Sequence, residues 1–401
     1  MKKRRYKIVF IDHTTKMGGG QVYLLRQLSQ LDKDRFKPLV VCPSDGALPD
    51  HVRRSGVDLH IVPIHQSIIN LRKEDLIGNP ISFLINPFRL AAGIWRLVSW
   101  LKRHKIDLVH LNSMKAGFYG SLAARYAGLP VVWDFKDLLS EDFFPSINRR
   151  LIVGMANRWV DYVVANSNAI AEAFIGQGGR KDKVRVIHNG IDLSQFHPDN
   201  KPSGLRVSLG LDPEIHLVSI FSRLDRWKGH VYFLQAAAQT REVHPDVHFL
   251  IVGATTFDND GYADELHTLT HDLGLADCVH YLGFREDIAD LMAMSDIVVH
   301  ASTLPEPLGL TPMEAQAAGR PVVAVKAGGV LETVEDGLTG VLVPPKNASA
   351  MAKALSDLLR SPDKRRQMGI AGRVRTEQLF DLQTNARRVQ DVYLELIDAH
   401  R

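Results

Sequence analysis

Short apolar runs alternate with longer amphipathic segments along almost the whole chain. The apolar runs are rich in Val, Ile and Leu and end at polar turns, which is typical of strands buried on both faces of a parallel sheet. In the first half this pattern predicts strands at 6–12, 37–42, 57–62, 107–111, 130–134, 161–166 and 183–187. In the second half it predicts strands at 216–221, 247–252, 278–282, 296–301, 321–325 and 339–343.

The segments between these strands repeat their apolar residues at the spacing of an amphipathic helix. They predict helices at 19–31, 115–127, 229–241, 261–273 and 348–360, and two further helical patterns in 362–401 that break near Phe380. The strand–helix alternation occurs twice in 401 residues, a length that exceeds a single hydrophobic core. We therefore predict an α/β protein with two doubly wound, Rossmann-like domains.

The stretch 191–204 is rich in Pro, Asp, Ser and Gly and marks the predicted domain boundary. It separates a domain at 1–195 from a domain at 196–375, and residues 376–401 follow as a C-terminal helix. Ligands of doubly wound sheets bind beyond the carboxyl ends of the strands. We therefore expect the functional site in the cleft that the two domains face.

Charge is distributed unevenly although the net charge is only +4. Residues 1–195 hold 29 Lys and Arg against 17 Asp and Glu, and the remaining residues hold 20 against 28. The basic half suits an anionic acceptor or an anionic membrane surface, although a solvated surface without a partner explains it equally well. We expect no nucleic-acid partner.

Few features point to secretion or to membrane insertion. The two cysteines, Cys42 and Cys278, allow no disulfide framework, and this favours a reducing compartment. The basic N-terminus has an apolar run too short for a signal peptide, and no uncharged apolar stretch of about 20 residues occurs. We expect a cytoplasmic protein.

The segment 64–105 departs from the strand–helix rhythm. Beyond Phe88 it is apolar and contains Trp95 and Trp100, apart from one narrow polar stripe at helical spacing formed by Arg89, Gly93, Arg96, Ser99 and Arg103. We favour a mostly buried helix against the sheet, because amphipathic helices are common in α/β domains. The alternative is a helix in a membrane interface, with tryptophan in the boundary layer.

Three loops that follow predicted strands carry residues suited to binding anions. Gly18–Gly20 opens a helix, where backbone N–H groups approach an anion closely, although three glycines also make a tight turn. Arg223 and Lys228 flank a turn and suit a diphosphate clamp, although they also fit two surface cations. The glycine loop has neither the GxGxxG nor the Walker A pattern.

The third loop reads PEPLGLTPMEA and ends in a helix start. Thr311 as N-cap and Glu314 at the third helical position form a capping box, which accounts for Glu314 without a ligand. It leaves Glu306 unexplained. The backbone from Gly309 through Leu310 to Thr311 offers amides to a phosphate.

Together these motifs resemble glycosyltransferase family 4, whose members are retaining enzymes of the GT-B fold. The resemblance rests on SRLDRWKG (222–229), EPLGLTPMEAQAAGRPVVA (306–324), VIHNGID (186–192) and GGVLETVEDGLTGVLV (328–343), and it runs over nearly the whole chain. It implies an N-terminal acceptor-binding domain, a C-terminal nucleotide-sugar domain and a last helix that crosses back to the first domain.

The resemblance also implies roles for individual residues. Arg223 and Lys228 would hold the donor diphosphate, Glu314 would accept hydrogen bonds from the ribose, and Glu306 would contact the transferred sugar. The remaining predicted donor contacts are Gly19, Gly20, Phe284, Arg285, Gly309, Leu310 and Thr311. Of these, Gly19 and Gly20 would approach the phosphates from the first domain, while the backbone of Phe284 and Arg285 would meet the nucleobase.

One position departs from the family pattern. In VVWDFKDLLS, Lys136 stands where the family commonly has histidine, and Asp137 follows it. Lys136 either binds an anionic group on the sugar or acceptor, such as a uronate or phosphate, or pairs with Asp134 or Asp137 in a structural role. The change leaves the donor sugar and the acceptor open.

No metal or cofactor is expected. Fixed cations aimed at the β-phosphate of a departing nucleotide lower the barrier without a metal ion. The D-x-D patterns Asp32/Asp34 and Asp258/Asp260 lie after a helix and in a loop, so we do not assign them as metal ligands. Retention of anomeric configuration follows from the resemblance, and front-face displacement is the default because we identify no covalent nucleophile.

The sequence therefore predicts a retaining, metal-independent glycosyltransferase of the hexosyltransferase type. We expect it to use a nucleotide-diphospho-sugar, most simply a UDP-sugar, and a glycan or lipid-linked acceptor, with peripheral contact to an anionic membrane at the inner face. The alternatives are a GT-B-fold sugar-nucleotide 2-epimerase, a nicotinamide-dependent oxidoreductase and a non-catalytic nucleotide-sugar-binding protein. The missing GxGxxG argues against the oxidoreductase.

Overall fold

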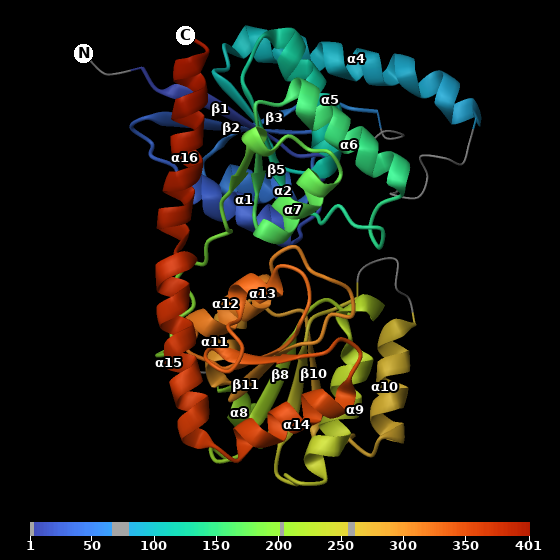
Figure 1. Cartoon of the computed structure of the whole chain (residues 1–401), viewed down its shortest axis with the longest axis vertical. Coiled ribbons are helices and arrows are strands. Elements are labelled where there is room, and N and C mark those ends of the chain that lie inside the picture. The colour runs from blue at the N-terminus through green and yellow to red at the C-terminus, as the bar shows by residue number, and fades with distance from the viewer. Residues whose placement is uncertain (1–3, 66–79, 201–203, 256–260) are drawn as a thin grey trace. The chain divides into compact units, whose positions relative to one another are not determined.

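A computed structural model describes residues 4–65, 80–200, 204–255 and 261–401. The chain forms two compact units (Figure 1). The first unit comprises Met1–Gly190 together with Leu382–Arg401, and the second comprises Ile191–Asp381. The last helix is therefore part of the first unit, although it follows the second unit in the sequence.

The first unit contains a seven-stranded sheet in the order β3-β2-β1-β4-β5-β6-β7. Every described strand pair in it is parallel. The direction in which the chain adds strands reverses between β1 and β4. Its strands are β1 Tyr6–Ile11, β2 Phe36–Cys42, β3 Asp58–Ile61, β4 Leu108–Leu111, β5 Val131–Phe135, β6 Tyr162–Ala165 and β7 Val184–Val186.

Helices cover both faces of this sheet. One face carries α4 Pro80–His104, α5 Met114–Ala127, α6 Ser146–Trp159 and α7 Asn168–Gly176, whose apolar residues share one core. The other face carries α1 Gly19–Ser29, α2 Ala47–Arg54 and α16 Leu382–Ala399. Val389, Val392 and Tyr393 of α16 lie in that core, so hydrophobic burial holds the last helix on the first unit.

The second unit repeats this architecture with a six-stranded parallel sheet in the order β10-β9-β8-β11-β12-β13. Its strands are β8 Leu217–Phe221, β9 His248–Val252, β10 Val279–Gly283, β11 Ile297–His300, β12 Val322–Val325 and β13 Gly340–Val343. One face packs on α9 His230–Arg241, α10 Tyr262–Asp272 and α14 Ala348–Leu359. The other packs on α8 Leu205–Ser208, α11 Ile288–Met294, α12 Leu310–Ala317 and α13 Val330–Thr333.

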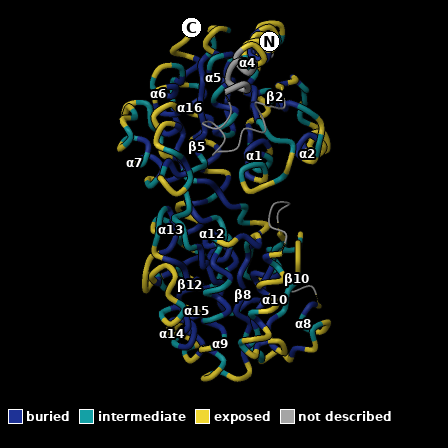
Figure 2. The backbone as a smooth tube through the Cα atoms, turned by 90° about the vertical axis from the view of Figure 1, so that its right-hand side faces the viewer, coloured by how far each residue is buried: buried dark blue, intermediate teal, exposed yellow. Residues whose placement is uncertain are grey.

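The strand and helix predictions are confirmed, including the break near Phe380: α15 spans Pro362–Leu379 and α16 begins at Leu382. Figure 2 shows the strands of each unit buried, with exposure concentrated on loops and outer helix faces. The α/β fold class with two doubly wound sheets therefore holds.

The prediction for α4 holds for one of its faces. Ile94, Leu97 and Leu101 are buried in the core of the first unit, as expected of a helix against the sheet. Gly93 was predicted to lie in the polar stripe, but it is buried and packs against Ile64, because a helix without a side chain there can approach closely. The opposite face of α4 is exposed, including Trp95.

Replacing Gly117 by alanine should lower the free energy of unfolding by about 1–3 kcal/mol. A Cβ atom at Gly117 in α5 would lie 1.8 Å from Cζ2 of Trp133, whose indole is fully buried. Gly154→Ala in α6 is the matched control, because nothing lies within 4 Å of that Cβ position. The control should be neutral or stabilising by about 0.5–1 kcal/mol, as helix propensity favours alanine. Chemical denaturation of both variants measures the difference, and equal stabilities would contradict the packing described.

Candidate functional site

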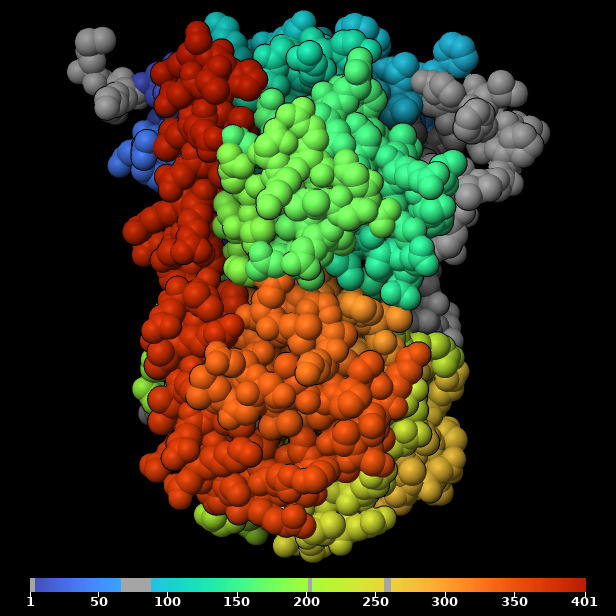
Figure 3. All heavy atoms as spheres, in the orientation of Figure 1, coloured from blue at the N-terminus to red at the C-terminus, as the bar shows by residue number. Residues whose placement is uncertain are grey.

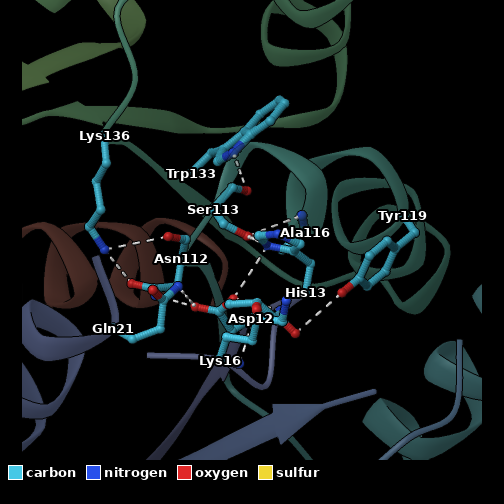
Figure 4. A network of polar contacts seen from close by, with 11 residues as sticks. Asp12, His13, Lys16, Gln21, Asn112, Ser113, Ala116, Tyr119, Trp133 and Lys136 are labelled. Atoms are coloured by element: carbon cyan, nitrogen blue, oxygen red, sulfur yellow. Dashed lines mark hydrogen bonds and ion pairs between the residues drawn. The ribbon is translucent and has the colours of Figure 1, made fainter. Parts of the chain in front are cut away.

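Polar side chains meet at the carboxyl ends of β1, β4 and β5, where the strand order of the first sheet reverses (Figure 4). Asp12 follows β1 and is fully buried. Its Oδ2 accepts hydrogen bonds from Asn112 Nδ2 at 2.6 Å and from Gln21 Nε2 at 3.1 Å. Asn112 follows β4, and Gln21 lies in α1. The network thus joins the first turn of α1 to two adjacent strand ends, the position at which doubly wound sheets bind ligands.

Lys136 follows β5 and its ammonium group is directed into this network. Its Nζ lies 3.0 Å from Asp134 Oδ2, donates to Asn112 Oδ1 and is 3.4 Å from the Asn112 carbonyl. The side chain is only 11% exposed. The three N–H groups of Lys136 therefore have protein acceptors, as expected for the structural alternative in which it pairs with Asp134.

Gly20 lies beside Lys136. A Cβ atom at Gly20 would be 3.6 Å from Cδ of Lys136, and Gly19 is the first residue of α1. Gly18 is the N-cap of α1 in an extended conformation and makes no side-chain cap. The glycine loop, Lys136 and the adjacent Asp137 are thus gathered at one edge of the first sheet, while their predicted ligand contacts remain predictions.

The buried acids of this network are ionised. Burial opposes ionisation of Asp12, but hydrogen bonds and charge from His13, with those from Thr14 and Asn112, hold its pKa below the ordinary value. Burial likewise opposes ionisation of Asp134, and the charge of Lys136 with contacts to His110 outweighs it, so the pKa of Asp134 is also lowered.

His110 extends the network to the last helix. Its Nδ1 lies 2.8 Å from the hydroxyl of Tyr393 in α16, and its Nε2 is 3.5 Å from Asp134 Oδ2. Burial lowers the pKa of His110 despite the nearby carboxylate, so its imidazole is neutral at pH 7. A continuous chain of buried polar contacts therefore connects α16 with Lys136.

The second unit has a corresponding cluster around Glu306, which follows β11. Its Oε1 lies 2.5 Å from Lys228 Nζ, 2.5 Å from Ser302 Oγ and 2.9 Å from His300 Nε2. Lys228 comes from the loop after β8, so the pair spans the two strand ends at which this sheet reverses order. Burial opposes ionisation of Glu306, but the charges of His300 and Lys228 outweigh it and lower the pKa strongly. Glu306 is a part-buried carboxylate held by a cation.

The two predicted diphosphate ligands differ in their surroundings. Lys228 is 16% exposed and lies against Glu306, whereas Arg223 is 55% exposed and its Nη2 is 3.0 Å from Asp225 Oδ2. Both follow β8. The arrangement gives one enclosed cation and one accessible cation beside the same strand end, and both remain predicted ligands.

The predicted capping box is wrong. Helix α12 begins at Leu310 with Gly309 as its N-cap, because Gly309 adopts φ +83°, a left-handed conformation that favours glycine. Thr311 is therefore inside the helix, and its Oγ1 donates to the carbonyl of Phe221 at 3.2 Å. That bond ties the start of α12 to the end of β8. Glu314 lies farther along α12 and is half-buried, so the capping box does not account for it.

The predicted nucleobase segment follows β10. Phe284 is 76% exposed, and Arg285 forms an ion pair with Asp287 at 2.6 Å. This pairing occupies the Arg285 side chain and is compatible with the predicted contact through its backbone. No described contact tests that role.

Sequence reasoning missed several residues of these clusters: Asp12, His110, Asn112, His300 and Ser302. A usable signal was present, because a polar residue inside or directly after a buried parallel strand must be satisfied at the sheet edge. Asp12 follows YKIVFI and Asn112 follows LVHL in this manner.

Other features bear on metals and membranes. Within the described residues, no group of three or more His, Cys, Asp or Glu side chains is placed to hold a metal ion. Asp32 accepts backbone N–H groups of Asp34 and Arg35, whereas Asp258 and Asp260 lie outside the described residues. Cys42 and Cys278 are free and buried. Among the helices that are described, none combines the length and apolar character needed to cross a bilayer.

Comparison with known proteins gives matches along nearly the whole chain. A family model described as Glycosyltransferase Family 4 matches residues 17–195, and one described as Glycosyl transferases group 1 matches residues 205–375. A D-inositol 3-phosphate glycosyltransferase of Streptomyces scabiei is 31% identical over 411 residues, covering 97% of this chain and 89% of the relative. One from Segniliparus rotundus is 32% identical, covering 79% and 71%.

Solved structures give the same result. The crystal structure of the Anabaena protein HepE in complex with UDP has a TM-score of 0.84 at 32% identity, covering 97% of this chain and all of that chain (100%). Its complex with UDP-glucose has a TM-score of 0.83. With two parallel, doubly wound sheets and these relatives, the chain belongs to glycosyltransferase family 4 and is a glycosyltransferase of the GT-B fold.

Proposed function

We propose that this enzyme transfers a hexosyl group from a UDP-sugar to a lipid-linked or polysaccharide acceptor, with retention of configuration and without a metal ion. The observation that carries the proposal is the Lys228–Glu306 cluster at the switch point of the second sheet. The Anabaena relative, which is 32% identical, has been solved with UDP and with UDP-glucose. These complexes support a UDP-sugar as the donor.

The chemistry follows from the charges at the ends of β8 and β11. As the sugar leaves, negative charge develops on the β-phosphate, and Lys228 and Arg223 would stabilise it. The backbone amides at the start of α12 would add positive potential at the same phosphates. In enzymes that use a divalent metal ion, the metal supplies this positive charge. Here two cations and a helix N-terminus would supply it, which supports a reaction without a metal ion. Front-face displacement remains our proposal for the stereochemistry.

The acceptor class is proposed from the relatives' names and from the charge of the chain. A relative that is 31% identical is named D-inositol 3-phosphate glycosyltransferase, and this name supports considering a phosphorylated acceptor. Lys136 is unsuited to hold such a phosphate, since its N–H groups already have acceptors in the protein. A lipid-linked or polysaccharide acceptor agrees with the basic first half of the chain.

Titration calorimetry with UDP, GDP, ADP and NAD, with and without EDTA, tests the donor assignment. We expect selective binding of UDP that EDTA does not change. Glu314→Ala should weaken UDP binding about 10-fold to 100-fold, because hydrogen bonds to a charged group contribute about 1.5–3 kcal/mol. Glu242→Ala is the control, an exposed glutamate at the C-terminal end of α9. Binding of NAD alone, of no nucleotide, or only without EDTA would overturn the proposal.

A further inference from the structure

Three consecutive helices of the first unit contain no acidic residue. These helices, α4, α5 and α6, pack on the same face of the sheet, and none includes Asp or Glu. Between residues 76 and 133 the chain has a single acid, Asp107. It is neutralised locally, because its Oδ1 lies 2.6 Å from Nη2 of Arg4. The helix layer formed by α4, α5 and α6 therefore carries positive charge, and no carboxylate within these helices offsets it.

Aromatic side chains project from the same layer. Phe88 is 81% exposed, Trp95 60% and Tyr126 58%. The rings of Trp95 in α4 and Tyr126 in α5 stack with their centroids 5.7 Å apart. Neighbouring large aromatic groups left in water mark an interaction surface more often than isolated apolar residues do. Figure 3 shows α4 at the surface of the molecule.

Cations surround these aromatic residues. We define the basic–aromatic face as Phe88, Trp95 and Tyr126 together with the exposed cations of α4 and α5, which are Arg89, Arg96, Lys102, Arg103 and Arg125. None of these five cations forms an ion pair with a described residue. Elsewhere exposed arginines do so, as Arg226 does with Glu265 in the second unit. Without an ion-pair partner among the described residues, these cations favour binding to an anionic partner outside the chain.

We propose that the basic–aromatic face docks this enzyme on a lipid bilayer that carries anionic headgroups. Tryptophan and tyrosine favour the boundary between headgroups and acyl chains, while Arg and Lys bind the negative surface. A second copy of the chain is a poor occupant, because pairing this face with itself opposes like charges. The proposal rests on the proposed function only in that docking would bring the enzyme to a lipid-linked acceptor.

The expected affinity has an electrostatic and an apolar part. Each cation near an anionic membrane surface contributes about fivefold to binding, equivalent to about 1 kcal/mol. Arg96→Glu/Arg103→Glu removes two cations and adds two anions, so vesicle binding should fall at least about 100-fold. Trp95→Ser/Tyr126→Ser keeps the charge and should lower vesicle binding about 10-fold or more, because it removes the aromatic area that the bilayer would bury. Binding should weaken as salt is raised.

Flotation with vesicles tests the proposal on the full chain. The vesicles are phosphatidylcholine alone, or with about a third phosphatidylglycerol. We expect wild type to float with the anionic vesicles only and both double variants to remain unbound. Lys364→Glu/Arg366→Glu in α15 changes the net charge equally on the second unit and should bind as wild type does.

Several results would overturn the proposal. One is that wild type does not float with anionic vesicles. Another is that the α15 control loses vesicle binding as strongly as the variants of the face do. A third is that Arg96→Glu/Arg103→Glu and Trp95→Ser/Tyr126→Ser both bind vesicles as wild type does. Two other results would assign the face to another partner. One is that wild type forms a dimer that the variants lose, and does not bind vesicles. The other is that wild type binds a duplex DNA probe and not vesicles, and that Trp95→Ser/Tyr126→Ser leaves the DNA binding intact. Flotation is measured without donor, so its failure is distinguishable from failure of UDP binding.

Discussion

Lys228→Met should weaken UDP binding by about 100-fold to 1000-fold, because truncating one partner of a hydrogen-bonded charge pair that is largely shielded from water costs about 2–5 kcal/mol. Two effects combine in this variant. The proposed β-phosphate ligand is lost, and Glu306 loses the ammonium group 2.5 Å from its Oε1. Glu306 is 11% exposed, and without this ammonium group it would repel an incoming diphosphate more strongly, although His300 Nε2 stays 2.9 Å from its Oε1. Calorimetric titration with UDP measures the change.

A double variant separates the two effects. Lys228→Met/Glu306→Gln removes the anion together with the cation, so it should bind UDP about 10-fold more tightly than Lys228→Met, although still more weakly than wild type. Arg226→Met is the matched control, since Arg226 lies in the same turn but pairs with Glu265 and is 64% exposed. Its UDP affinity should stay near that of wild type. Equal affinities of the single and double variants would show that Glu306 does not oppose the donor.

The same pair has a consequence for pH dependence. His300 and Lys228 hold the pKa of Glu306 well below its ordinary value. The carboxylate therefore stays ionised throughout the neutral range, and its contribution to stability is lost only as the pH falls below the ordinary range for glutamate and through the lowered pKa. A change in UDP affinity between pH 6 and 8 would have to come from another group, including the second ionisation of the phosphate itself.

The strands were predictable because a strand that is buried on both faces of a sheet is a continuous run of apolar residues. A run such as VHFLIV has no polar alternation, and no exposed face competes with the pattern. The positions of Arg223, Lys228 and Glu306 after β8 and β11 followed from the same logic, because parallel strands deliver their carboxyl ends to one edge. Their proximity in the structure depends on strand order, which the sequence pattern alone does not specify.

The details at the strand ends were less predictable because they depend on side-chain geometry. Thr311 has the composition of an N-cap, yet the left-handed φ of Gly309 starts the helix earlier and turns the hydroxyl toward Phe221. Local preference was overridden by a tertiary hydrogen bond. Likewise, the sequence left two partners open for Lys136, and only the fold brings Asn112 from another strand into contact with it.

Lys136→Met should lower the free energy of unfolding by about 3–5 kcal/mol, the cost of leaving a buried charge without its partner. Asp134 is 3% exposed. Among the residues that the structure describes, its remaining ion-pair partner would be His110, which is 3.5 Å away and neutral because burial lowers its pKa. Asn112 would also lose a donor to its Oδ1. Since Asn112 positions Asp12 beside α1, we expect the loss to disturb the glycine loop as well. Urea denaturation followed by circular dichroism measures the change.

If an unpaired charge destabilises Lys136→Met, two further results are expected. Lys136→Met/Asp134→Asn should recover most of the lost stability, because no unpaired carboxylate remains. In wild type, Lys136 lowers the pKa of Asp134, so the pair contributes stability above the ordinary aspartate pKa of about 3.9 and loses it only at more acidic pH. In Lys136→Met, burial without a cation raises that pKa, and the variant gains stability as the pH falls toward it. Its deficit relative to wild type should therefore be smaller at pH 5 than at pH 8. Two results would contradict this explanation: a loss of stability that is the same at pH 5 and pH 8, or a double variant as unstable as Lys136→Met. Either would mean that the lost packing of the lysine stem, and not an unpaired charge, destabilises the protein.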